Sequence, residues 1–183
     1  NPEIGERFEF VEAQEIKIEV TFEKHLQSKI LKALFSNHVY EEVAYEIYDL
    51  QNSHQNIGLG MIGELENPMS EIDFLEFVKD KMQCGGIRHS QLLGKQVKKI
   101  AVLGGSGSFA IKNTIQANVD VFLTSDLKYH NFYEAENQIV LADIGHFESE
   151  RYTKNYIVDF LKEKITNFAI VLSEENTNPV KYL

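Results

Sequence analysis

The sequence has a single cysteine, Cys84, among its 183 residues. An intrachain disulfide needs two thiols and a cysteine zinc cluster needs several, so both are excluded within the chain. One cysteine fits a reducing compartment, and we expect a cytoplasmic protein. No apolar run approaches the roughly 20 residues that cross a bilayer, and the first residues lack the basic and apolar segments of a secretory signal. No membrane partner is therefore expected.

Basic residues are also few, since 18 lysines and arginines stand against 28 acids, for a formal net charge of -10. Such a surface repels phosphate backbones and anionic lipid, so nucleic acid is an unlikely partner outside a local basic groove. Apolar residues make up 43% of the chain, enough for a packed core, and we expect a globular protein. The sequence lacks an initiator methionine, which suggests that it begins partway into a longer protein.

The amino-terminal part predicts a small α+β unit. Residues 7–22 mostly alternate apolar and charged side chains, residues 23–37 carry apolar side chains on one helical face, and residues 43–51 alternate again. These periods are typical of strand, helix and strand in turn. The polar break "SHQN" follows, and we place a domain boundary there, between residues 1–52 and 53–183.

The second part predicts a layered α/β/α domain. A glycine-rich strand or turn at residues 57–65 precedes an amphipathic helix at 70–83, with Ser70 as its N-cap. Apolar strands then alternate with helices: strands at 98–105, 119–125, 138–143 and 167–174, and helices at 108–118, 127–137 and 147–165. This alternation is typical of a mainly parallel or mixed sheet. The fold class is therefore α/β, with the small α+β segment in front.

Three junctions between a strand and the following helix are polar or rich in glycine. They read "GGSGS" (104–108), "TSDLKYH" (124–130) and "DIGHFESE" (143–150). Ligands of α/β sheets bind beyond the carboxyl ends of the strands. If these strands are parallel neighbours, the three junctions open at one edge, where we expect the functional site.

The third junction contains a candidate metal-binding pair, His146 and Glu150. These residues are four apart, so on a helix both side chains leave one face with Cβ atoms roughly 6 Å apart. Imidazole nitrogen and carboxylate oxygen both bind divalent ions at about 2.0 to 2.2 Å. Gly145 would let the backbone approach a bound group. The alternative is an ordinary first helical turn, in which Glu148 and Glu150 oppose the positive end of the helix dipole.

The second junction offers an acid, a cation and an imidazole, which are Asp126, Lys128 and His130. An imidazole can move protons at neutral pH, and an ammonium group can pair with a phosphate or carboxylate. We take all three as candidate catalytic residues. The alternative is a polar helix start with Ser125 or Asp126 as its cap.

The first junction is a candidate anion site, made of Gly104, Gly105, Ser106, Gly107 and Ser108. Its backbone N–H groups can cradle an anion, with a helix N-terminus behind them. The Lys-Ser/Thr ending of a P-loop is absent, so ATPase or GTPase chemistry of that kind is not indicated. The junction does match Gly-x-Gly-x-x-Ala, with Asp126 after the next strand, so a dinucleotide-binding domain is another hypothesis. A tight turn without a ligand would use the same glycines.

The chain resembles the Nif-three-like family, often labelled GTP cyclohydrolase type 2 homologues with a dinuclear metal centre. The resemblance lies in the blocks "AYEIYDLQ", "GLGMIGEL", "IAVLGGSGS", "DVFLTSDLKYH" and "DIGHFESE", and it spans nearly all of residues 38–183. It implies two divalent metal ions per intact site, zinc, iron or manganese, with their last two ligands at His146 and Glu150. It also implies that Asp126, Lys128 and His130 line the same cavity.

The resemblance further implies a domain identity for each part of the chain. Residues 1–52 resemble the closing part of a PII-like or CutA-like insert, which has a ferredoxin-like fold. Residues 53–183 resemble the carboxy-terminal half of the metal domain. The family's amino-terminal half, with a Gly-His-His-Pro ligand block and a further aspartate ligand, is absent, and Met61 stands where the family usually has arginine.

Two functions follow from the resemblance. The first is a metal-dependent, hydrolase-like enzyme that acts on a nucleotide or similar phosphorylated small molecule. The second is a metal-binding scaffold or regulatory protein without catalysis, since family members commonly assemble as homo-oligomeric, hexameric toroids. With only two obvious ligands, this chain alone is expected to bind metal weakly and to be inactive.

Overall fold

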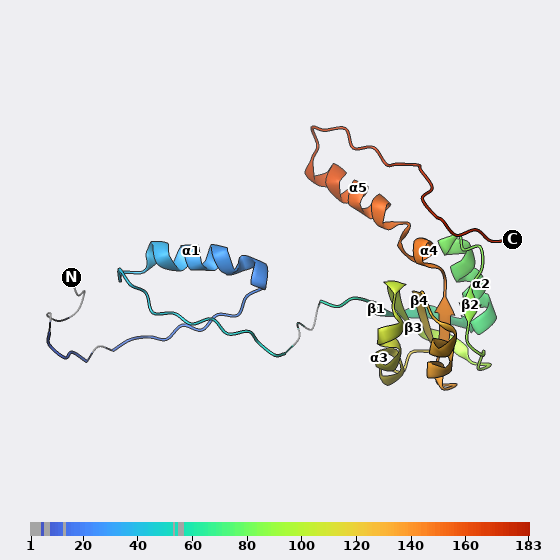
Figure 1. Cartoon of the computed structure of the whole chain (residues 1–183), viewed down its shortest axis with the longest axis horizontal. Helices are drawn as coiled ribbons and strands as arrows, with labels where there is room; N and C mark the ends of the chain where they lie inside the picture. Colours follow the sequence, from blue (N-terminus) through green and yellow to red (C-terminus); the bar gives the residue numbers. More distant parts are fainter. Residues whose placement is uncertain (1–4, 6–7, 13, 53, 55–56) are drawn as a thin grey trace. The chain divides into compact units, whose positions relative to one another are not determined.

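The computed structural model describes residues 5, 8–12, 14–52, 54 and 57–183. The chain divides into two compact units, Asn1–Ser53 and His54–Leu183 (Figure 1). Among the described residues, no helix combines the length and the apolar character that a membrane span requires.

The described part of the first unit contains one α-helix. A 3-10 turn, η1 (Lys24–Leu26), leads into α1 (Gln27–Asn37), in agreement with the predicted helix over 23–37. Asn37 ends it as expected, and its side-chain Nδ2 donates to the carbonyl of Ala33 at 2.8 Å. The Phe35 ring lies edge-on to Tyr45, with centroids 5.4 Å apart.

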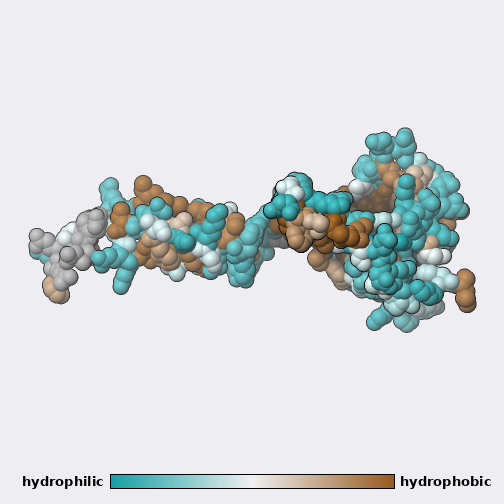
Figure 2. Space-filling view, turned by 90° about the horizontal axis from the view of Figure 1, so that it is seen from above, coloured by the Kyte–Doolittle hydropathy of each residue, from teal (hydrophilic) through white to brown (hydrophobic). Residues whose placement is uncertain are grey.

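The two strands predicted in this unit are wrong for the described residues, which form no ladder. Alternation along residues 8–22 and 43–51 produces a strand only if a neighbouring strand accepts and donates the backbone hydrogen bonds. Apolar side chains such as Phe10 and Ile18 are exposed instead. Hydrophobic side chains are accordingly seen at the surface of the unit (Figure 2).

The second unit is built on a five-stranded mixed sheet with the order β1-β3-β4-β5-β2. The strands are β1 (Met61–Ser70), β2 (Arg88–His89), β3 (Gln96–Ser106), β4 (Val121–Ser125) and β5 (Val140–Asp143). β3, β4 and β5 are parallel neighbours, while β1 pairs antiparallel with β3 and β2 antiparallel with β5. The predicted α/β class with a mixed sheet is confirmed.

Two apolar clusters cover the two faces of this sheet. α2 (Glu71–Met82) supplies Phe74 and Val78 to the cluster that contains Val121 of β4. The next residue of β4, Phe122, belongs to the other cluster with Ile111 of α3. Successive side chains of a strand face opposite ways, so the central strands are buried on both faces.

Further helical segments follow β3 along the chain. They are η2 (Ser108–Ala110), α3 (Ile111–Gln116), η3 (Tyr129–Ala135), α4 (His146–Glu150) and α5 (Thr153–Lys164). The long helix expected over 147–165 is broken between α4 and α5. Contacts to the end of α2 hold the break, because Tyr152 Oη donates to the Lys81 carbonyl at 3.1 Å.

Of the two helix caps predicted from the sequence, one is confirmed and one is wrong. Ser70 caps α2 as predicted, and its Oγ accepts from the Asp73 N–H at 3.2 Å. The helix expected over 127–137 is the 3-10 helix η3, and its N-cap is Lys128 rather than Ser125 or Asp126.

The strand expected over residues 167–174 is wrong, since the structure has no strand there. Phe168 and Val171 are exposed, because this segment finds no partner strand. The antiparallel strand β2 beside β5 was not predicted, since two residues carry no readable period.

Cys84, which follows α2, is a buried free thiol with 7% of its surface exposed. Burial, and then the charge of Glu148, raises the pKa of this thiol to about 11. We expect iodoacetamide at pH 8 to alkylate it far more slowly in the native chain than in urea, because the thiolate is the reactive form. Mass spectrometry over time measures both rates, and equal rates would contradict the expectation.

Candidate metal centre

The three polar junctions meet at one edge of the sheet. β3, β4 and β5 run parallel and side by side, so their carboxyl ends are neighbours. α4, which starts just after β5, packs against both β3 and β4. The Gly105 N–H of the first junction donates to Ser149 Oγ of α4 at 2.9 Å. The predicted convergence of the junctions is therefore present.

His146 lies between two carboxylates at this edge. Its Nδ1 is 2.7 Å from Asp126 Oδ2, and its Nε2 is 3.3 Å from Glu150 Oε2. All three side chains are about half exposed. The hydrogen bond with Asp126 raises the pKa of His146; burial opposes this rise, and the charges of Asp126 and Glu150 add to it. One carboxylate comes from the junction after β4 and the other from the next turn of α4.

The His146–Glu150 geometry fits two ligands of one ion. Two ligand atoms at about 2.1 Å from a tetrahedral ion are about 3.4 Å apart, and Nε2 and Oε2 are 3.3 Å apart. Asp126 then bonds the other ring nitrogen, the arrangement in which a carboxylate fixes the tautomer and orientation of a ligating histidine. Asp126 is thus placed behind the ligand.

The described part of the chain does not complete such a site by itself. Within the residues that the structure describes, no group of three or more His, Cys, Asp and Glu side chains is arranged to hold a metal ion. The reason is visible at His146, whose two carboxylate partners approach opposite nitrogens of the ring and do not converge on one point.

One residue in each junction has a left-handed backbone: Gly105 (φ 68°), Asp126 (φ 56°) and Gly145 (φ 91°). A Cβ on Gly105 would lie 2.6 Å from Glu150 Oε1, and a Cβ on Gly145 would collide with the Glu148 carboxylate. These two glycines are required by both conformation and space. Asp126, a non-glycine residue in this region, stores strain beside His146.

A buried carboxylate, Asp143, links the second and third junctions. Its Oδ2 accepts from the Leu127 N–H at 2.9 Å and from Arg88 Nη2, and its Oδ1 accepts from the Gly145 N–H at 3.1 Å. The Arg88 guanidinium also donates to the Leu127 carbonyl at 2.9 Å. Asp143 therefore holds the residues that flank Asp126 and His146. Sequence reasoning missed it, and its only signal was an acid ending the apolar run "IVLA".

Comparison with known proteins matches this architecture to a family. The family model of Duf34/NIF3 (NGG1p interacting factor 3) matches residues 4–179. The chain belongs to the Duf34/NIF3 family. The resemblance stated from the sequence is therefore confirmed.

Relatives in this family carry the name "GTP cyclohydrolase 1 type 2 homolog". The chain is 35% identical to the one from Bacillus subtilis and 32% identical to the one from Listeria innocua, over 187 residues in each case. Each match covers 100% of this chain and 50% of the relative. The chain thus spans about half the length of the curated relatives it matches.

Solved structures of the same kind share the fold. A Bacillus cereus protein related to NIF3 matches with a TM-score of 0.68 and 33% identity, over 87% of this chain and 45% of that one. A Staphylococcus aureus protein matches with a TM-score of 0.70 and 26% identity, over 91% of this chain and 55% of that one.

Two candidate catalytic residues of this NIF3-family chain do not contact His146. Lys128, the N-cap of η3, and His130, within η3, are both exposed. The Lys128 N–H donates to Asn131 Oδ1 at 2.9 Å, and the His130 ring lies edge-on to Tyr129 with centroids 5.3 Å apart. In the described part of the chain neither residue hydrogen-bonds His146, so their catalytic roles stay predictions.

The glycine-rich junction is closely packed. The Gly105 N–H is already bonded to Ser149, and the Gly105 carbonyl accepts from Thr124 Oγ1 at 3.2 Å. A Cβ on Gly107 would collide with that same Thr124 hydroxyl. At these two glycines the structure favours the tight-turn alternative.

The anion role of the other three residues, Gly104, Ser106 and Ser108, stays a prediction. The dinucleotide hypothesis gains no support from the geometry, because η2 separates the glycines from α3.

The alternative of an ordinary first helical turn treats Glu148 and Glu150 alike, but the structure places Glu148 in a different environment. Its side chain is buried, and Oε1 accepts from Asn178 Nδ2 at 3.0 Å. It anchors the carboxy-terminal segment beside α4 and does not face solvent. Glu148 and Glu150 therefore play separate parts, and Glu150 alone faces His146.

Proposed function

We propose that the intact protein is a metal-dependent, hydrolase-like enzyme acting on a nucleotide or a similar phosphorylated small molecule. The observation that supports this is His146, held between Asp126 behind it and Glu150 in front at 2.7 and 3.3 Å. The relatives' name, GTP cyclohydrolase 1 type 2 homolog, supports the substrate class.

His146 Nε2 and Glu150 would hold one divalent ion, of zinc, iron or manganese. Such an ion activates water and neutralises negative charge on a phosphorylated substrate. In that complex the Asp126 carboxylate would accept a hydrogen bond from Nδ1–H of His146, which would leave the Nε2 lone pair free on the side of Glu150. By family resemblance, the second ion and the remaining ligands belong to the half of the relatives that this chain does not cover.

The chain's own residues also supply groups for the substrate. Lys128 presents an exposed ammonium that can pair with a phosphate, and His130 presents an exposed imidazole that can carry a proton. Lys128 is the N-cap of η3 and His130 lies within it, and η3 starts three residues after Asp126. A substrate held by the ion would therefore need to reach across this junction to use them.

The second candidate function is a metal-binding hexameric scaffold without catalysis. The exposed apolar face of α5 favours it, since Tyr156, Ile157 and Phe160 are all exposed. Exposed apolar patches of this kind are typical of surfaces that another chain covers.

Turnover assays on the intact protein separate the two functions. The protein is loaded with zinc, iron or manganese and incubated with GTP and other nucleotides, and products are measured by chromatography. We expect product that disappears on chelation and returns with the metal. Metal-dependent assembly without product would instead support the scaffold, and an intact protein that binds no divalent metal would contradict both.

A further inference from the structure

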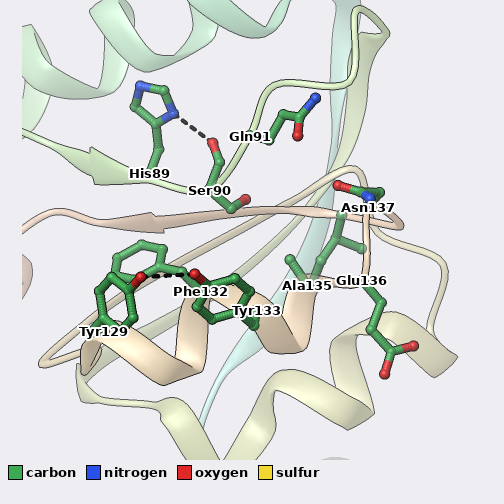
Figure 3. A pocket seen from close by; sticks show the side chains of 10 residues that line it. His89, Ser90, Gln91, Tyr129, Phe132, Tyr133, Ala135, Glu136 and Asn137 are labelled. Atoms are coloured by element: carbon green, nitrogen blue, oxygen red, sulfur yellow. Dashed lines mark hydrogen bonds between the residues drawn. The ribbon is translucent and has the colours of Figure 1, made fainter.

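A pocket of about 400 Å³ lies between the segment after β2 and the 3-10 helix η3 (Figure 3). Tyr129, Phe132 and Tyr133 of η3 form one wall, and the buried residues Ala135 and Ile139 also line it. Pockets for small molecules start at about 300 Å³, so this one suits a molecule of one or two rings.

The aromatic wall is exposed and ordered by its own contacts. Tyr129 and Tyr133 have 69% and 67% of their surface exposed, and their hydroxyl oxygens are 2.8 Å apart. The rings cross at 73° with centroids 5.5 Å apart. The hydrogen bond with Tyr129 raises the pKa of Tyr133, which keeps the Tyr133 phenol uncharged at neutral pH. The wall offers flat, neutral surfaces for stacking.

The start of this wall is held rigidly. Arg88 bonds the Leu127 carbonyl, and its guanidinium lies 5.6 Å from the centre of the Phe132 ring. The buried Asp143 offsets the charge of this guanidinium. The same contacts therefore order the junction near His146 and the aromatic wall, which is a preorganised surface for a ligand.

The remaining lining is polar but nearly uncharged. Gln91 and Asn137 contribute side-chain amides, and among the described residues neither amide has a hydrogen-bond partner (Figure 3). Lysine and arginine are absent from the lining residues. The one acid, Glu136, accepts from Gln138 Nε2 at 3.1 Å and turns away from the tyrosine rings (Figure 3). The pocket thus offers both donors and acceptors without attracting an anion.

We propose that this pocket binds an uncharged, planar nitrogen heterocycle of the nucleobase class. The ring stacks on one of the two tyrosines, Tyr129 or Tyr133, and meets the other edge-on, because their rings cross at 73°. Its edge pairs with the amides of Gln91 and Asn137. Stacking on tyrosine suits any flat heterocycle, and an amide presents a donor beside an acceptor, as a base edge does. The choice of nucleobases rests on the proposed function, since the pocket would take the base of a nucleotide.

Calorimetric titration of the metal-free chain with guanosine and adenosine tests the pocket, because these nucleosides carry no phosphate. We expect binding that weakens about tenfold in Tyr129→Ala and in Tyr133→Ala, since each removes one of the two aromatic contacts of the ligand. Tyr133→Phe keeps the ring and should change the affinity less than about threefold. Tyr156→Ala, at an exposed tyrosine of α5, is the matched control and should leave it unchanged.

The result of the nucleoside titration can be distinguished from a result on the metal site. Inorganic phosphate should not compete with the nucleosides, because they carry no phosphate. Binding that persists in a protein without metal supports the pocket even if the proposed hydrolase function fails. No nucleoside binding at millimolar concentration, or equal affinity in the chain and in correctly folded Tyr129→Ala and Tyr133→Ala variants, would overturn it. Circular dichroism verifies the folding of each variant.

Discussion

His146→Ala is expected to lower the affinity of the intact protein for divalent metal by at least about 100-fold. The substitution removes the Nε2 atom that lies 3.3 Å from Glu150 Oε2, so one of the two candidate ligands on this chain is lost. Loss of a ligand should exceed the roughly 10- to 100-fold effect of removing a carboxylate behind a ligating histidine. Equilibrium dialysis followed by elemental analysis measures the affinity.

Three companion variants sharpen this result. Glu150→Gln should match His146→Ala, whereas Asp126→Asn should cost about 10- to 100-fold, because Asp126 acts through the histidine. Asparagine also tolerates the left-handed backbone of position 126, so the variant changes the charge without adding strain. His25→Ala, at an exposed histidine of the first unit, is the control. Unchanged metal content in His146→Ala would remove the basis of the metal centre.

Asp143→Ala is expected to destabilise the second unit by about 3 to 5 kcal/mol. Asp143 has 5% of its surface exposed, and its carboxylate is bonded to the Leu127 and Gly145 N–H groups and to Arg88. Alanine would leave two backbone donors without partners and the guanidinium without its counter-charge. Urea denaturation followed by circular dichroism measures the change.

Asp159→Ala provides the matched control for this prediction. Asp159 is an exposed acid on α5, and surface substitutions of this kind change stability by less than about 0.5 kcal/mol. Equal unfolding midpoints for Asp143→Ala and Asp159→Ala would show that the buried carboxylate does not hold the two junctions together. Reduced metal affinity of the intact Asp143→Ala protein is expected as well, since both flanks of the site lose their anchor.

The sequence correctly predicted the strands and the helix whose apolar side chains form the core of the second unit. β3, β4, β5 and α2 were found because their apolar residues follow the period of their own structure and pack into the two clusters of the core. The predicted strands at 7–22, 43–51 and 167–174 were wrong where the structure describes them. An alternating pattern states which face a strand would bury, but it does not provide the partner strand that makes the ladder.

By itself the sequence determined the α/β class and a candidate pair four residues apart on one helical turn, because these depend on local period and spacing. The family was indicated separately, by the resemblance of five sequence blocks. Tertiary structure alone decided that Asp126 stands behind His146, that Asp143 ties two junctions together, and that Tyr129 and Tyr133 face the segment after β2. Those contacts join residues from different strands and loops. The distances between these residues depend on the order and register of the parallel strands, which no local sequence pattern encodes.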